Sequence, residues 1–146
     1  MVVVIADTSG LIASIDQDAP EHEGARKVLN QASVVVVPQL VLAELDHLVS
    51  RRFGKTLAAR LLDSLIAQAE RTRVHFAEAD AAVLRTARAV QDQHADLRLD
   101  LTDAVITAVA REYMTASILT LDRKDFRAIR PLTGEPAFQV LPDDDW

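Results

Sequence analysis

The stretch VVVIADTSG, residues 2–10, decides the fold class of this chain of 146 residues. Its first five residues form a short apolar run, mostly of β-branched side chains, which stops at Asp7. A short apolar run bounded by turn residues is typical of a strand that is buried on both faces, as in a parallel sheet. We therefore predict a buried strand at 2–6, followed by a short helix that Thr8 or Ser9 caps.

Further strand and helix patterns alternate along the rest of the chain. Apolar runs predict strands at 33–37, 73–76, 117–121 and 137–141. Apolar residues at helical spacing predict helices at 8–15, 20–31, 40–53, 57–70, 78–93 and 100–113, of which the second has Pro20 in its first turn. Strands separated by helices indicate a parallel sheet with right-handed crossovers.

The predicted fold class is α/β, with a single domain at 1–141. We expect a central, mostly parallel sheet of four to five strands flanked by helices on both faces. Residues 142–146 are expected to form an acidic surface tail that frays. The apolar start of the chain lacks a basic leader and is too short to span a bilayer, so we expect a cytoplasmic protein without a membrane segment.

Composition excludes several classes of function. The chain has no cysteine, which excludes a disulfide scaffold, a zinc finger, an iron–sulfur protein and a cysteine nucleophile. Aromatic residues make up 4% of the chain, too few for a platform that stacks single-stranded bases. Asp and Glu number 22 against 16 Lys and Arg, and the resulting net charge of −6 counts against a generic nucleic-acid binder.

Two aspartates directly follow predicted strands. Asp7 follows the strand at 2–6, and Asp122 follows the strand at 117–121. Because ligands of open parallel sheets bind beyond the carboxyl ends of the strands, both carboxylates are candidate site residues. Each also fits an ordinary role as a helix cap or turn residue, and the sequence leaves that alternative open.

Two further acids lie in predicted helices. Glu44, within the apolar segment LVLAEL, is either a site residue or an exposed residue of its helix. Asp103 lies in the first turn of the helix at 100–113, where acids are favoured in any case, and Asp100 is a candidate N-cap. Several carboxylates at one sheet edge repel one another, which predicts a compensating cation. Oxygen ligands without Cys or paired His select Mg²⁺ or Mn²⁺, and such a site suits phosphoryl chemistry.

Four short motifs, in this order, resemble those of PIN-domain ribonucleases. They are Asp7-Thr8-Ser9, Ala43-Glu44-Leu45, the helical segment TDAVITAVA from Thr102 to Ala110, and Leu119-Thr120-Leu121-Asp122 followed by Phe126. Their order, their spacing and the length of the chain most resemble VapC-type toxins of bacterial toxin–antitoxin pairs. The resemblance covers residues 2–140.

The resemblance assigns roles to individual residues. The metal-binding and catalytic carboxylates become Asp7, Glu44, Asp103 and Asp122. The supporting hydroxyls become Thr8, Ser9 and Thr120. Asp100 and Asp125 each lie three residues from a motif aspartate, and the sequence leaves open whether either shares or replaces a metal role.

The resemblance also implies an activity and partners. It implies a PIN-like domain with Mg²⁺-dependent (or Mn²⁺-dependent) endoribonuclease activity, commonly on structured RNA such as tRNA or rRNA. We expect hydrolysis by a metal-activated water, which inhibits translation until a cognate antitoxin occludes the site. Homodimerisation is implied as well.

Basic residues near Asp122 are candidates for contacts to RNA phosphates. They are Arg123, Lys124, Arg127 and Arg130, and they are favoured over two other basic clusters, one of Arg51, Arg52 and Lys55 and one of Arg71 and Arg73, because they adjoin Asp122. The alternative is a set of solvated helix ends, where cations are favoured without a ligand. Setting aside the four site carboxylates and the three C-terminal aspartates changes the net charge from −6 to +1, so the acidity is concentrated in these two places. We therefore expect RNA binding to require divalent metal.

Two other classes of function are alternatives. A non-cleaving RNA- or protein-binding module on the same fold predicts RNA binding without metal-dependent cleavage. A phosphotransfer protein also has an Asp after a strand, but Asp7-Thr8-Ser9 has neither the acidic pair of receiver domains nor the Asp-x-Asp of haloacid-dehalogenase-like phosphatases. The four histidines show no metal-ligand spacing.

Overall fold

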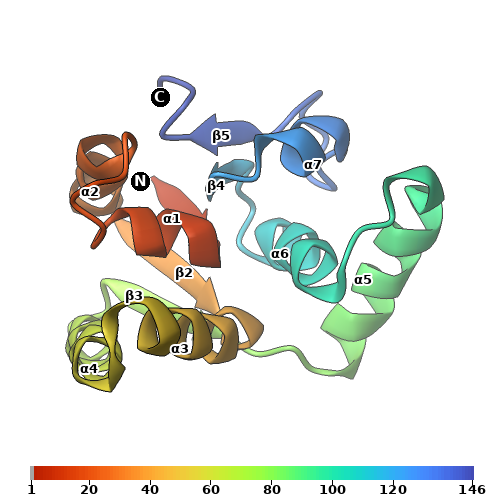
Figure 1. The fold of residues 1–146 in the computed structure, drawn as a ribbon. Helices are drawn as coiled ribbons and strands as arrows, with labels where there is room; N and C mark the ends of the chain where they lie inside the picture. Colours follow the sequence, from red (N-terminus) through yellow and green to blue (C-terminus); the bar gives the residue numbers. More distant parts are fainter. Residues whose placement is uncertain (1) are drawn as a thin grey trace.

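A five-stranded sheet runs through the centre of the molecule (Figure 1). The computed structural model describes residues 2–146, so Met1, the first residue of the predicted domain, lies outside the described residues. The strands are β1 (Val3–Ala6), β2 (Val34–Pro38), β3 (Val74–Ala77), β4 (Ser117–Leu119) and β5 (Gln139–Leu141). Their order is β3-β2-β1-β4-β5, and every pair is parallel. The predicted parallel α/β sheet is confirmed.

Helices cover both faces of the sheet, as predicted. They are α1 (Thr8–Ala13), α2 (His22–Gln31), α3 (Gln39–Phe53), α4 (Lys55–Glu70), α5 (Ala81–Gln93), α6 (Leu101–Glu112) and α7 (Arg123–Ala128), with a 3₁₀ turn η1 (Ala95–Leu97) before α6. In Figure 1, α1 and α2 lie on one side of the central strands, and α5 and α6 lie on the other. No helix within residues 2–146 is long and apolar enough to cross a membrane.

The strand order places a switch point between β1 and β4. From β1 the chain adds β2 and β3 on one side, and it then crosses back to place β4 and β5 on the other side. Right-handed connections from β1 and β4 therefore leave towards opposite faces. This divergence opens a crevice beyond the carboxyl ends of the two strands, where open parallel sheets bind their ligands.

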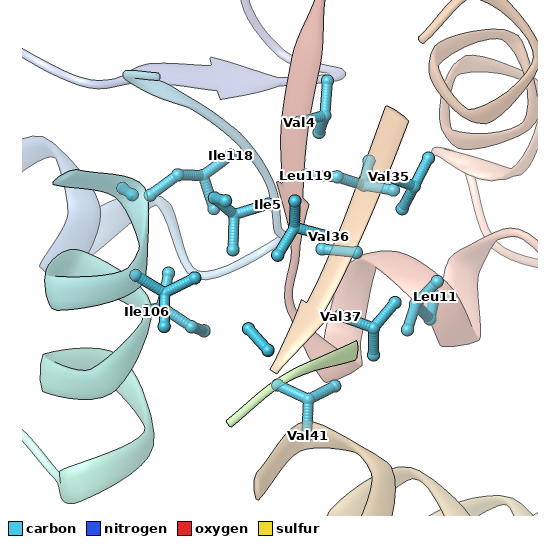
Figure 2. Packing of buried hydrophobic residues seen from close by; sticks show 14 of the residues in the cluster. Val4, Ile5, Leu11, Val35, Val36, Val37, Val41, Ile106, Ile118 and Leu119 are labelled. Atoms are coloured by element: carbon cyan, nitrogen blue, oxygen red, sulfur yellow. The ribbon is translucent and has the colours of Figure 1, made fainter. Parts of the chain in front are cut away.

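Apolar side chains from both faces pack on the central strands (Figure 2). Val36 and Val37 are neighbours in β2 and point to opposite faces, and both are completely buried. Leu11 of α1 packs near Val37, whereas Ile106 of α6 packs from the other side near Ile5. The central strands are thus buried on both faces, which is why they are continuous apolar runs in the sequence.

Some boundaries differ from the prediction because side chains end the elements. β4 ends at Leu119 rather than at residue 121, since the amide of Leu121 donates to Ser9 Oγ (2.9 Å) and not to a neighbouring strand. The cap of α1 is neither Thr8 nor Ser9 but Asp7, in the alternative role that the sequence left open for it. The Asp7 carboxylate accepts a hydrogen bond from the amide of Thr8 (2.8 Å).

Two helices and the last strand begin later than predicted. Pro20 lies in a turn, and α2 begins two residues beyond it. α5 begins at Ala81 because the Asp80 carboxylate accepts a hydrogen bond from the amide of Val83 (2.9 Å) and thereby caps the helix. β5 begins two residues beyond the predicted start at 137.

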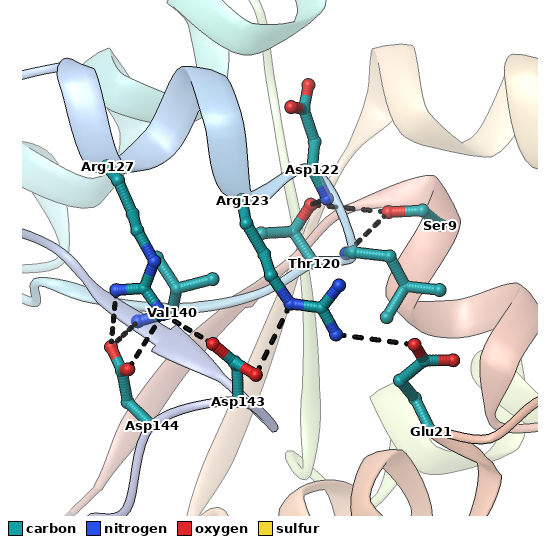
Figure 3. Close-up of polar contacts among 10 residues, drawn as sticks. Ser9, Glu21, Thr120, Asp122, Arg123, Arg127, Val140, Asp143 and Asp144 are labelled. Carbon is teal, nitrogen blue, oxygen red and sulfur yellow. Dashed lines mark hydrogen bonds and ion pairs between the residues drawn. The ribbon is translucent and has the colours of Figure 1, made fainter.

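Ion pairs attach the acidic C-terminus to the domain (Figure 3). The guanidinium of Arg127 lies 2.6 Å from a carboxylate oxygen of Asp143 and 2.9 Å from one of Asp144. The Asp144 carboxylate also accepts a hydrogen bond from the amide of Val140 (2.8 Å). The structure therefore holds Asp143 and Asp144 against α7, where the sequence predicted a tail that frays.

Gly10 allows α1 to lie directly against β4. A Cβ atom at this position would lie 2.6 Å from both Cγ and the carbonyl oxygen of Leu119. The oxygen belongs to the backbone of a buried strand, so it has little freedom to move away.

We predict that Gly10→Ala lowers the free energy of unfolding by about 1–3 kcal/mol, the usual cost of overpacking, although alanine favours helices. Urea unfolding in EDTA measures this change. Gln31→Ala, on the exposed end of α2, is the control and is expected to stay within about 0.5 kcal/mol of the wild type. Unchanged stability of Gly10→Ala would contradict the tight contact between α1 and β4.

Candidate metal centre

The four motif carboxylates converge beyond the carboxyl ends of β1 and β4. They are Asp7 after β1, Glu44 in α3, Asp103 in the first turn of α6 and Asp122 at the start of α7. All four line one cavity of about 390 Å³, together with Thr8, Ser9 and Asp100. Residues as far apart in the sequence as Asp7 and Asp122 thus meet at the predicted edge of the sheet.

Asp7 is the most firmly held of these carboxylates. It is buried, with 6% of its surface exposed. One carboxylate oxygen accepts a hydrogen bond from the amide of Thr8 and the other accepts one from Thr120 Oγ1, both at 2.8 Å. Burial raises the pKa of Asp7 and these two hydrogen bonds lower it, while the charges of Glu44 and Asp122 raise it further.

The hydroxyls of Ser9 and Thr120 meet beyond the end of β4 (Figure 3), and Thr120 connects them to Asp7. Thr120 donates its only hydroxyl proton to Asp7, so in its 3.2 Å contact with Ser9 the Ser9 hydroxyl is the donor. Thr120 Oγ1 also accepts a hydrogen bond from the amide of Asp122 (3.0 Å). The predicted supporting positions of Ser9 and Thr120 therefore link the two halves of the site.

Thr8 contributes through its backbone. Its amide bonds Asp7, whereas its own buried hydroxyl has no hydrogen-bond partner among residues 2–146. The structure therefore places the threonine beside the site without showing a contact for its side chain.

Asp103, Asp122 and Asp125 form the tightest acidic cluster. Each offers a carboxylate oxygen, and the three oxygens lie within 4.8 Å of one another. Burial raises the pKa of Asp103 to about 8, with further contributions from the charges of its acidic neighbours. Burial and the charge of Asp122 also raise the pKa of Asp125. The structure thus brings Asp125 into the cluster, a position that the sequence left open.

Asp100 and Asp122 are helix caps as well as cavity residues. Asp100 accepts a hydrogen bond from the amide of Asp103 (2.9 Å) and caps α6, which confirms the predicted N-cap. Asp122 accepts one from the amide of Asp125 (3.3 Å) and caps α7. Asp122 is therefore both a helix cap and a residue of the site, two roles that the sequence left as alternatives.

Glu44 is the exposed member of the group. α3 buries Val41, Leu45 and Val49, whereas Glu44 lies on an exposed face of the helix beside this buried row. The exposed glutamate nevertheless lines the cavity, because this face of α3 borders the crevice. Its charge contributes to the raised pKa of Asp7.

A PIN-domain family model matches residues 4–131 of the chain. The chain belongs to the PIN-domain family. Ribonuclease VapC26 of Mycobacterium tuberculosis (strain ATCC 25618 / H37Rv) is 35% identical over 140 residues, which cover 95% of this chain and 100% of that protein. The resemblance to VapC-type PIN ribonucleases predicted from the four motifs is confirmed, and with it the class of enzyme.

Two solved structures share this PIN fold. The crystal structure of Mycobacterium tuberculosis VapC20, a sarcin–ricin loop cleaving toxin, has a TM-score of 0.70 and 22% sequence identity, and the match covers 83% of this chain and 91% of that chain. VapBC2 from Rickettsia felis, bound to a DNA fragment from its promoter, has a TM-score of 0.65 and 18% identity, with 90% and 96% covered. At these identities the likeness establishes the fold.

The structure divides the four basic residues that were predicted to contact RNA. Arg127 is engaged by the C-terminal aspartates, and Arg123 lies 3.3 Å from Glu21 and also pairs with the C-terminal segment (Figure 3). Lys124 and Arg130 are exposed and form no ion pair within residues 2–146. Carboxylates of the protein therefore already neutralise the charges of Arg123 and Arg127, two of the four side chains that were predicted to contact RNA.

Arg52 and Asp16 are cavity residues outside the four motifs; Arg52 belongs to one of the basic clusters of the sequence, whereas no sequence pattern singled out Asp16. Both line the same cavity as the acids, and their side chains form an ion pair of 3.1 Å. A signal was present in the spacing, because Glu44, Leu48 and Arg52 are four residues apart and such residues share one face of a helix. The pairing with Asp16 depends on how α1 and α3 pack.

The raised pKa of Asp103 predicts a dependence of stability on pH. Its pKa is about 8 in the folded protein and about 3.9 in an unfolded chain, so unfolding releases a proton between these values. In EDTA, the contribution of this group to the free energy of unfolding therefore falls as the pH rises from about 4 to about 8. We predict that at pH 8 Asp103→Asn is more stable than the wild type by at least about 1 kcal/mol, and that the gain shrinks towards pH 4.

Urea unfolding in EDTA across this pH range provides the measurement. Asp63→Asn, at an exposed position of α4, is the matched control and should show no gain that grows with pH. Mg²⁺ should stabilise the wild type more than Asp103→Asn, because the wild type retains the full set of carboxylates. Lower stability of Asp103→Asn at pH 8 would contradict a destabilising cluster of like charges.

Proposed function

We propose that this PIN ribonuclease is a Mg²⁺- or Mn²⁺-dependent endoribonuclease that cleaves structured RNA, of the tRNA or rRNA class, and inhibits translation until an antitoxin binds it. The observation that carries the metal dependence is the cluster of Asp103, Asp122 and Asp125. Carboxylates so close together do not all remain charged without a cation. Support for the substrate class comes from the relatives, one named a ribonuclease and one a sarcin–ricin loop cleaving toxin.

The donors in the cavity fit a hard divalent cation. They are carboxylate oxygens, which Mg²⁺ and Mn²⁺ prefer. Asp103, Asp122 and Asp125 would hold the ion, with Asp7 and Glu44 as further acidic groups on the cavity wall. When bound, the ion would lower the pKa of a water molecule and neutralise charge on the phosphate.

The remaining side chains of the site position these groups. Thr120 and the amide of Thr8 hold Asp7, and the hydroxyl of Ser9 contacts Thr120 and accepts from the amide of Leu121. Ser9 is therefore a structural residue and not a nucleophile. In the proposed hydrolysis, water adds to phosphorus and the bond to the 3′ oxygen breaks, leaving 5′-phosphate and 3′-hydroxyl ends.

The proposed protein partners are a cognate antitoxin and a second copy of the chain. A VapBC pair is named in the Rickettsia felis structure that shares the fold. Phe53 in α3 and Leu62 and Ile66 in α4 are exposed apolar side chains of the kind that protein partners cover. We propose that the protein acts in the cytoplasm, where its RNA substrates are.

We predict that Asp7→Asn lowers the rate of RNA cleavage in Mg²⁺ at least about a hundredfold, because even the supporting partners of metal ligands contribute about ten- to a hundredfold. The measurement is the initial rate of cleavage of purified tRNA and rRNA, with the ends mapped. Asp63→Asn is the control for loss of one negative charge and should retain the wild-type rate. An unchanged rate in Asp7→Asn would remove Asp7 from the mechanism.

A second prediction separates Asp125 from Asp100. Asp125 belongs to the tight cluster, whereas one oxygen of Asp100 accepts the amide of Asp103 and caps α6. We expect Asp125→Asn to weaken Mn²⁺ binding, measured by calorimetry, at least about tenfold. Asp100→Asn retains the cap and should change Mn²⁺ affinity less. The reverse order would assign the metal role to Asp100.

A further inference from the structure

A groove leads away from the acids between α1 and α3. One wall has Thr8, Ile12 and Asp16, and the other has Glu44, Leu48 and Arg52, and all six line the cavity of the site. Each row has a spacing of four residues, which places its members along one face of a helix. α1 ends at Ala13, and the turn that follows keeps Asp16 close to it, because the amide of Asp16 donates to the carbonyl of Ile12 (2.9 Å).

The two ends of the groove differ in charge, because one holds the acids and the other holds the ion pair of Arg52 and Asp16. The acidic cluster lies at the end with Thr8 and Glu44, and Arg52 lies eight residues further along α3, about 12 Å at the rise of an α-helix. Arg52 is the one basic side chain among the described residues that line this cavity. The groove therefore runs from a site for a metal cation to an arginine, with apolar side chains between them.

Arg52 is held loosely in its present position. Its guanidinium lies 3.1 Å from Asp16 and 5.0 Å from the centre of the Phe53 ring. The Arg52 side chain is 53% exposed, whereas the Asp16 side chain is 17% exposed, so the guanidinium is open to a ligand from solvent. A phosphate can bind it in place of Asp16, since a guanidinium binds carboxylates and phosphates in the same two-pronged geometry.

We propose that this groove is a subsite for the nucleotide next to the cleaved bond, and that Arg52 binds a phosphate of the RNA strand in exchange for Asp16. Ile12 and Leu48, on opposite walls, contact the nucleoside between the two charged ends. The proposal rests on the proposed cleavage of RNA at the acidic end. It places the positive contact in α3, in contrast to Arg123 and Arg127, whose charges the C-terminal segment already engages.

The test compares Arg52→Ala with Arg51→Ala. Arg51 is the neighbouring exposed arginine of α3, and it does not line the cavity. Binding of a fluorescein-labelled single-stranded RNA is measured by anisotropy in Ca²⁺, an ion that binds carboxylates but suits this hydrolysis poorly, and a gel checks that the RNA stays intact. Cleavage of purified tRNA and rRNA in Mg²⁺ then separates KM from kcat.

Loss of a phosphate contact has a specific signature. We expect Arg52→Ala to weaken RNA binding about tenfold and to lower the slope of log affinity against log salt by about 1. KM should rise while kcat stays within about twofold, because the contact lies away from the reacting atoms. Arg52→Lys should restore part of the affinity, and Arg51→Ala should match the wild type.

Asp16→Asn distinguishes a phosphate contact from a structural ion pair. This variant removes the competing carboxylate, so it should bind RNA at least as tightly as the wild type. Weaker binding in Asp16→Asn, equal to that in Arg52→Ala, would overturn the proposal, as would equal affinities of Arg52→Ala and Arg51→Ala. A wild-type protein that neither binds nor cleaves RNA would refute the proposed function instead.

Discussion

The junction between the ends of β1 and β4 is the constraint on which the site depends. The amide of Asp7 donates to the carbonyl of Leu119 (2.9 Å), and the Asp7 carboxylate accepts from the hydroxyl of Thr120 (2.8 Å). Backbone hydrogen bonds between β1 and β4 are thus followed directly by a side-chain hydrogen bond within the site. Gly10 keeps α1 close enough to β4 for these contacts to form. The position of the first carboxylate is therefore set by the parallel sheet itself.

The fold gathers carboxylates at a cost in stability. Asp7 and Asp103 are both buried, and burial raises the pKa of each. The hydrogen bonds to Asp7 offset part of this cost, because they satisfy both oxygens of a buried carboxylate. A cation would relieve the repulsion in such a cluster, so the geometry that weakens the metal-free protein is the geometry on which the proposed metal site rests.

The arrangement of charge matters more here than the net value of −6. The C-terminal aspartates do not act as a free acidic tail, since Asp143 and Asp144 pair with Arg127 and fasten the end of the chain to α7. This pairing also holds α7, the helix that Asp122 caps and whose first turn carries Asp125. Basic side chains that seemed available for RNA are thereby engaged, while Arg52 on another helix lines the cavity.

The sequence alone determined the fold class, the convergence of the acids and the family. The spacing of apolar residues identifies the amphipathic helices, and the length of the apolar runs identifies the buried strands. The acids after 2–6 and 117–121 lie at one edge of the sheet because parallel strands end on the same side. The tertiary structure alone decided that Asp125 joins Asp103, that Arg123 and Arg127 face carboxylates, and that Arg52 pairs with Asp16. These outcomes depend on helix packing and on contacts between residues far apart in the chain, and local sequence patterns carry no information about such contacts.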